Sequence, residues 1–129
     1  MTIREVGQLI TRTEVVSLPG TATVREASRL MADQGVGAVL VMEGSALQGI
    51  FTERDALNRV LAKGRDPDAT LLSEVMSKNL VTLGPRAAAV DALRLMSEIG
   101  FRHLPVIEDG EVHGIISLRD FVGAEFQQA

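Results

Sequence analysis

The 129-residue chain contains no cysteine, tryptophan or tyrosine, and only four phenylalanines and two histidines. The absence of cysteine excludes disulfides, thiol catalysis and thiolate metal sites. No apolar run approaches the roughly 18 residues of a membrane-spanning helix, because the longest, residues 36–42, has the length of a strand. The N-terminus has no hydrophobic signal core, so we expect a cytoplasmic protein without a membrane partner.

Charge and histidine content narrow the function further. The 13 basic and 17 acidic residues give a net charge of −4, which argues against general nucleic-acid binding but leaves room for local anion pockets. His103 and His113 do not form a metal-ligand motif, and no nucleophile has a recognisable base beside it. We therefore expect neither a metal site nor an enzyme. With 46% hydrophobic and 23% charged residues, the composition is typical of a folded domain.

The sequence is an internal duplication. A shift of 65 positions aligns residues 16–56 with residues 81–121 without a gap, and 14 of these 41 pairs are identical. This period exceeds the roughly 20–50 residues of solenoid repeats, so two copies indicate a pseudo-symmetric pair. We divide the chain into repeats at 1–64 and 65–129, each with a lead-in helix.

Both copies predict the order strand, helix, strand, strand, helix. The first helix is predicted at Val24–Gln34, with a capping box at Thr23 and Glu26, and at Ala89–Ile99; glycines 35 and 100 end these helices. The predicted strands are 15–18, 36–42 and 47–51 in the first copy, and 80–83, 103–108 and 111–116 in the second. Final helices begin at Thr52 and Ser117, lead-in helices cover 2–10 (capped by Thr2 and Glu5) and 70–76, and 63–68 is a linker.

Each copy places an aspartate three positions after a hydroxyl residue: Asp55 after Thr52, and Asp120 after Ser117. Such a pair is most simply a capping box that satisfies the free N–H groups of a helix start. The same geometry also suits a nucleotide, because a helix start attracts phosphate and a carboxylate accepts both hydroxyls of a ribose. The neighbouring Arg54 and Arg119 would neutralise phosphate. The motif alone does not choose between these interpretations.

These motifs make the chain resemble a known family. They are the string Gly-Phe-Arg-His-Leu-Pro-Val-Ile-Glu-Asp-Gly at 100–110, the two Gly-x-x-(Thr/Ser)-x-Arg-Asp segments, Val75-Met76-Ser77 and the Leu-Met pairs of the helices. The chain resembles a tandem pair of CBS domains, the Bateman module, over roughly residues 8–124, in the manner of a stand-alone bacterial-type CBS protein. The resemblance implies a mixed α/β (α+β) fold of two CBS repeats, each β-α-β-β-α, packed sheet to sheet with pseudo-twofold symmetry.

The resemblance also implies two clefts that bind adenosyl compounds such as AMP, ADP, ATP, NAD or S-adenosylmethionine. In each cleft the aspartate would hold the ribose diol, the hydroxyl would reach ribose or phosphate, and apolar residues would sandwich the adenine. One cleft would be formed by Thr11, Val16, Val36, Gly37, Ile115, Ser117, Arg119 and Asp120. The other would be formed by Met76, Val81, Phe101, Arg102, His103, Ile50, Thr52, Arg54 and Asp55.

Differences between the two copies indicate which cleft has more room for a ligand. Gly37 stands where the second copy has Arg102, so the Asp120 cleft would have small residues opposite it and more room. Phe101 and Arg102 would either fill the Asp55 cleft or supply a phosphate partner. We expect Asp120 to mark the preferred site. For His103 we favour a solvated or structurally bonded strand histidine over a phosphate contact.

Two functions follow from the resemblance, and a third is not expected. The first is a regulatory module that binds an adenosine-containing ligand without requiring a cofactor. The second is a ligand-free scaffold for dimerisation and protein interaction. Catalysis is not expected, because no activated nucleophile is present. In either role we expect a homodimer, built as a disc of two modules, and an unidentified regulated protein as partner.

Overall fold

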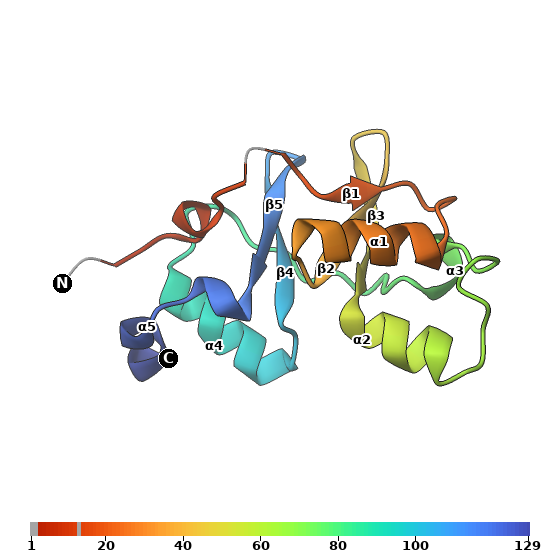
Figure 1. Cartoon of the computed structure of the whole chain (residues 1–129). Coiled ribbons are helices and arrows are strands. Elements are labelled where there is room, and N and C mark those ends of the chain that lie inside the picture. The colour runs from red at the N-terminus through yellow and green to blue at the C-terminus, as the bar shows by residue number, and fades with distance from the viewer. Residues whose placement is uncertain (1–2, 13) are drawn as a thin grey trace. The chain divides into compact units, whose positions relative to one another are not determined.

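The computed structural model describes residues 3–12 and 14–129, and the chain divides into two compact units (Figure 1). We call residues Val16–Leu80 the central unit, and the N-terminal stretch up to Val15 together with Val81–Ala129 the terminal unit. The lead-in segment of each repeat thus belongs to the unit that contains the body of the other repeat. The division at 1–64 and 65–129 follows the sequence repeat and stays a prediction.

The central unit is built on a three-stranded sheet in the order β1–β2–β3. Strand β1 (Ser17–Leu18) is parallel to β2 (Ala38–Glu43), which is antiparallel to β3 (Ala46–Thr52). Helix α1 (Val24–Gln34) precedes the hairpin; α2 (Glu53–Asp55), the π-helical η2 (Ala56–Leu61) and α3 (Leu72–Val75) follow it.

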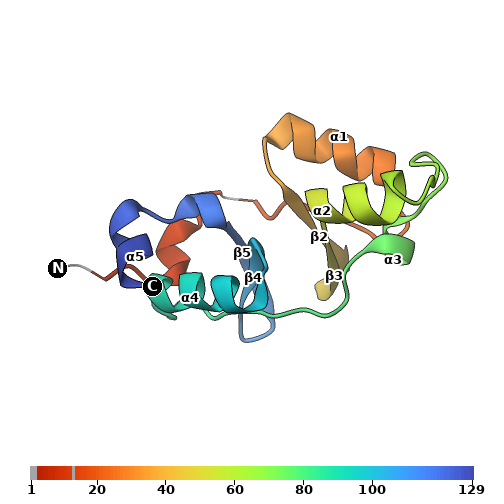
Figure 2. The same ribbon diagram turned by 90° about the horizontal axis from the view of Figure 1, so that it is seen from below.

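Figure 2 shows α1 and the helical stretch that begins with α2 on the same side of β2 and β3, and residues of all these segments share one buried cluster. The buried cluster combines Ala27 and Met31 of α1, Val39 and Val41 of β2, and Phe51 of β3. Val39 and Val41 are two positions apart, so they point to the same face of β2.

The terminal unit contains one hairpin, in which β4 (His103–Glu108) is antiparallel to β5 (Glu111–Ser117). Helix α4 (Ala89–Ile99) precedes the hairpin, and the 3₁₀ turn η3 (Leu118–Asp120) and α5 (Gly123–Gln128) follow it. The N-terminal 3₁₀ turn η1 (Val6–Leu9) joins this unit, because the Val6 N–H donates to the Ala87 carbonyl at 2.8 Å. Val6, Leu93 and Leu104 lie in its core.

Most of the predicted elements are confirmed. Helices α1 and α4 and strand β4 have the predicted bounds, and Gly35 and Gly100 end their helices with φ of 66° and 75°. The predicted strand at 80–83 was wrong, because only a single bridge, from Leu83 to Val106, is formed there. Among the described residues, the lead-in segments form η1 and α3, which are shorter than the predicted helices.

The predicted cap of the first lead-in segment lies partly outside the described residues, which do not include Thr2. Within them, Glu5 and Gln8 form the cap instead, and the Glu5 N–H donates to Gln8 Oε1 at 2.7 Å.

The final helix of the second repeat is interrupted, which the sequence did not predict. In the first repeat α2 continues into η2, whereas η3 ends at Asp120 and a new helix, α5, begins at Gly123. The Val122 N–H donates to Glu125 Oε1 at 2.9 Å, so the Glu125 carboxylate caps this new helix. The matching residue of the first repeat is Val60, which has no acceptor to offer. In the described part of the chain, no helix has the length and apolar character required to cross a membrane.

Candidate functional site

The first hydroxyl–aspartate pair lies at the end of β3, in what we call the Asp55 corner (Thr52, Asp55, Arg59 and Ser77). Asp55 is only 6% exposed. Its Oδ2 accepts the Thr52 N–H at 3.0 Å and the Thr52 hydroxyl at 3.2 Å, and the Asp55 N–H donates to Thr52 Oγ1 at 3.3 Å. The predicted capping box is therefore formed.

Two further side chains close the Asp55 corner. The Ser77 hydroxyl donates to Asp55 Oδ1 and Oδ2, at 3.1 and 3.3 Å, and the bridge between Ile50 and Ser77 holds it in place. Arg59 Nε lies 3.5 Å from Asp55 Oδ1, one helical turn away. A carboxylate has about four acceptor positions. Three hydrogen-bond donors and one cation therefore surround the Asp55 carboxylate within the central unit.

Arg59 is itself anchored at this corner. Its Nη1 donates to the main-chain carbonyls of Val75 and Met76, at 3.3 and 3.1 Å. These residues lead directly into Ser77, so one guanidinium ties the aspartate to the segment that carries the serine. The Asp55 corner is a cross-linked part of the fold.

The second pair, which we call the Asp120 corner (Ser117 and Asp120), is more open. The Ser117 N–H donates to Asp120 Oδ2 at 2.6 Å, and the Ser117 hydroxyl lies 3.3 Å from the same oxygen. From the residues that the structure describes, Asp120 Oδ1 accepts no hydrogen bond, and the side chain is half-buried. Ala124 and Arg12 occupy the positions that match Arg59 and Ser77. The Asp120 corner therefore forms its capping box and keeps one carboxylate oxygen available.

The residues of the two predicted clefts are distributed over both units. The central unit contains Val16, Val36, Gly37, Ile50, Thr52, Arg54, Asp55 and Met76. The terminal unit contains Thr11, Val81, Phe101, Arg102, His103, Ile115, Ser117, Arg119 and Asp120. Each predicted cleft draws on both units, so the two groupings stay predictions.

Within each unit the structure brings some of these residues together. Ile50 lies beside the Asp55 corner through its bridge to Ser77. The Gly37 carbonyl accepts the Glu53 N–H at 3.0 Å, and in the terminal unit the Arg102 carbonyl accepts the Leu118 N–H at 3.0 Å. Residues 37 and 102 therefore each lie beside the corner of their own repeat.

The β4–β5 register also places His103 opposite Ser117. Sequence reasoning assigned both Arg102 and His103 to the Asp55 cleft, yet within the terminal unit they are neighbours of the Asp120 corner.

Sequence reasoning did not assign Arg59 and Ser77 to a site. The Arg59 signal was available, because an arginine four residues after an aspartate on a helix forms an ion pair. Ser77 gave no such signal, since it is separated from Asp55 by 22 positions and reaches it only through the bridge to Ile50. Across residues 3–12 and 14–129, no group of three or more histidine, aspartate or glutamate side chains is placed to hold a metal ion.

Comparison with known proteins identifies the class. The family model described as CBS domain matches the chain twice, at residues 3–62 and 72–126. The chain therefore belongs to the CBS domain family and is a CBS pair, a regulatory class of module. The resemblance predicted from the motifs and the mixed α/β fold class are both confirmed.

Two relatives and one solved structure show how far the similarity extends. CBSCBSPB3 of Arabidopsis thaliana is 41% identical over 106 residues, which cover 81% of this chain and 19% of that protein. YhcV of Bacillus subtilis is 39% identical over 108 residues, 84% of this chain and 76% of that protein. The chain thus spans about a fifth of the first relative and about three quarters of the second.

The CBS domain protein PAE2072 from Pyrobaculum aerophilum, solved in complex with AMP, superposes with a TM-score of 0.85. The two chains are 28% identical, and the superposition covers 96% of each.

Proposed function

We propose that this CBS pair is a sensor that binds an adenosine-containing ligand, such as AMP, ADP, ATP, NAD or S-adenosylmethionine, at the Asp120 corner. The observation that carries the proposal is the difference between the two aspartates. Asp55 accepts hydrogen bonds from Thr52 and Ser77 and pairs with Arg59, whereas Asp120 Oδ1 is open to a ligand.

A ribose diol matches the chemistry of the open carboxylate. Its two neighbouring hydroxyls are both donors, and an ionised carboxylate accepts two such bonds. Oδ2 already accepts the N–H and the hydroxyl of Ser117, so the two lone pairs of Asp120 Oδ1 would accept the two ribose hydroxyls. The Ser117 hydroxyl and the exposed Arg102 beside it provide polar contacts for phosphate. The complex of PAE2072 with AMP supports an adenosine compound over other diols.

A ligand regulates such a module only if it binds one arrangement of the protein more tightly than another. The direct test is calorimetric titration with each of the five ligands. We expect one of them to bind with a stoichiometry of one per chain. At about 100 times its dissociation constant it would stabilise the fold by about 2.7 kcal/mol. No heat and no shift in Tm with any of the five at millimolar concentration would contradict the proposal.

A second candidate function, self-association without a ligand, has its own observation. Leu57 and Leu61 are 58% and 67% exposed, and Val122 and Phe126, at the matching positions of the second repeat, are 50% and 49% exposed. Duplicated exposed apolar pairs favour a surface that meets a second copy. Sedimentation analysis of Leu57→Ser/Leu61→Ser tests this candidate, with Ile3→Ser as the control for an exposed apolar side chain. A wild-type monomer would overturn it.

A further inference from the structure

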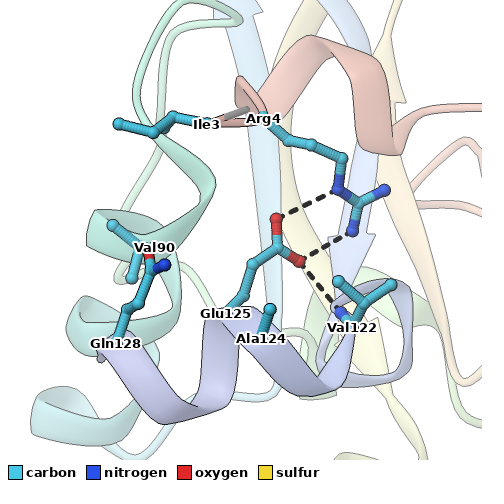
Figure 3. Close-up of a pocket in the computed structure, with 7 residues that line it drawn as sticks. All are labelled: Ile3, Arg4, Val90, Val122, Ala124, Glu125 and Gln128. Carbon is cyan, nitrogen blue, oxygen red and sulfur yellow. Dashed lines mark hydrogen bonds and ion pairs between the residues drawn. The ribbon is translucent and has the colours of Figure 1, made fainter. Parts of the chain in front are cut away.

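An ion pair ties the N-terminal segment of the terminal unit to its last helix. Arg4 Nε donates to Glu125 Oε2 at 3.0 Å and Arg4 Nη2 donates to Oε1 at 2.7 Å, a bidentate arrangement that Figure 3 shows from the side of the small pocket next to it. The Arg4 backbone is fixed as well, because its carbonyl accepts the Ala89 N–H at 2.8 Å at the start of α4.

Glu125 occupies a position that the duplication otherwise fills with an apolar residue. Glu125 is 7% exposed, and the matching residue of the first repeat is the core residue Val60. A buried carboxylate is costly unless it is paired. The hydrogen bond from Arg4 holds the pKa of Glu125 below its ordinary value, so the carboxylate stays charged against its burial. The terminal unit therefore needs Arg4 to neutralise Glu125, a need that Val60 does not create in the central unit.

The same guanidinium also contacts the candidate ligand site. Arg4 Nη2 donates to the main-chain carbonyl of Asp120 at 3.1 Å. Asp120 is thus held from two sides: Ser117 binds its carboxylate and Arg4 binds its backbone. A continuous chain of hydrogen bonds runs from Asp120 through Arg4 and Glu125 to the Val122 N–H at the start of α5.

We infer that Arg4 is a positioning residue for the Asp120 corner and couples ligand binding there to the docking of α5. The part of this inference that concerns ligand binding rests on the proposed function. Arg4 does not touch the ligand; it orients the peptide of Asp120, so that the open Oδ1 is presented in one direction. Because Glu125 shares the same guanidinium, undocking of α5 loosens this peptide, and a ligand that requires it ordered favours the docked helix.

The experiment compares Arg4→Ala with the double variant Arg4→Ala/Glu125→Val. The double variant places at position 125 the apolar residue that Val60 supplies in the central unit, so no unpaired charge is buried. The hydrogen bond from Arg4 to the Asp120 carbonyl is still absent. Arg25→Ala is the matched control, because Arg25 forms a bidentate pair with Asp68 in the central unit.

Two readouts are taken. The first is amide hydrogen exchange at Ser117 and Thr52, whose N–H groups bind the two aspartates. We expect exchange at Ser117 to become about tenfold faster in both Arg4 variants, with Thr52 and the β4 amides unchanged. The second is AMP affinity, or that of whichever of the five adenosine compounds the wild type binds. We expect it to fall about fivefold in both Arg4 variants and to stay at the wild-type value in Arg25→Ala.

The outcomes separate the inference from the proposed function. Wild-type Ser117 exchange in the double variant would show that Arg4 acts only through Glu125, and would overturn the inference. Faster exchange throughout the terminal unit would do the same, because it would reveal a general loss of stability. If the wild type binds none of the ligands, the proposed function fails, and the Ser117 exchange alone then supports or overturns the positioning role.

Discussion

The Asp55 and Asp120 corners have the same local motif but use their carboxylates differently. Both aspartates cap the turn that follows a hairpin, so the capping box alone distinguishes nothing. What differs is the surroundings: Ser77 and Arg59 contact the carboxylate of Asp55, whereas Arg12 and Ala124 occupy the matching positions in the terminal unit. Two copies of one motif can thus differ in their available acceptors without any change in the motif itself, and the proposed function assigns the ligand to the more open copy.

The largest expected effect is on stability and separates the two corners. Asp55→Ala leaves the Thr52 N–H and the Ser77 hydroxyl without an acceptor and removes the charge partner of Arg59. We expect the free energy of unfolding to fall by about 3 kcal/mol. Asp120→Ala removes only a cap and should cost about 1 kcal/mol. Urea unfolding measures both free energies, and an equal loss of stability in the two variants would contradict the difference between the corners.

Removing the partners of Asp55 should make the Asp55 corner accessible to a ligand. Ser77→Ala combined with Arg59→Gln removes the hydroxyl and the cation that fill Asp55, at a cost of about 1–2 kcal/mol in stability. The carboxylate then resembles that of Asp120. We expect calorimetry to detect a second, weaker binding step for the ligand. Arg94→Gln, which breaks an exposed pair with Asp91, is the control and should leave the stoichiometry unchanged. A double variant that still binds one ligand per chain would show that Ser77 and Arg59 are not what prevents a ligand from binding to Asp55.

The smallest effect is the pH dependence of the Arg4–Glu125 pair in the terminal unit. Because the pKa of Glu125 is lowered, chiefly by the Arg4 hydrogen bond, the unfolded chain binds more protons near the ordinary value of 4.5. The stability that the pair contributes is therefore present above pH 4.5 and is lost as the pH falls through the lowered pKa.

The comparison is between the wild type and Arg4→Ala/Glu125→Val in urea unfolding at pH 3, 4, 5 and 6. The difference in unfolding free energy should be constant at the two higher values and should shift in favour of the variant below them. The pKa values of Asp68 and Glu74 are also lowered, the first by Arg25 and the second by the Leu71 N–H and Arg65. These groups are present in the wild type and in the variant, so their effect cancels in the difference. A constant difference at all four pH values would contradict the role given to Glu125.

Much of this arrangement could be predicted from the sequence, because it depends on local patterns. The bounds of α1 and α4 followed from apolar periodicity and from glycines 35 and 100, and both capping boxes followed from spacing alone. The broken final helix was missed because it depends on one glutamate, Glu125, whose capping bond competes with continuation of the helix. Ser77 and Arg4 were missed because they act across 22 and 116 positions, a distance at which local patterns carry no information.

The order of the two corners stays a prediction, and the structure offers a different reason for it from the one that the sequence offers. The sequence argument relied on the small size of Gly37 and the bulk of Arg102. The structure places the difference in the hydrogen bonds of the aspartates themselves, which depend on partners outside the motif.

The most direct test of this account is the effect of two matched substitutions on ligand affinity. Asp120→Asn and Asp55→Asn each keep the shape of the side chain and remove its charge. Calorimetric titration should show that Asp120→Asn weakens binding at least about tenfold, the loss of a charged acceptor for a ribose hydroxyl, while Asp55→Asn stays within about threefold of the wild type. Binding weakened more by Asp55→Asn than by Asp120→Asn, in protein shown to be folded, would contradict it.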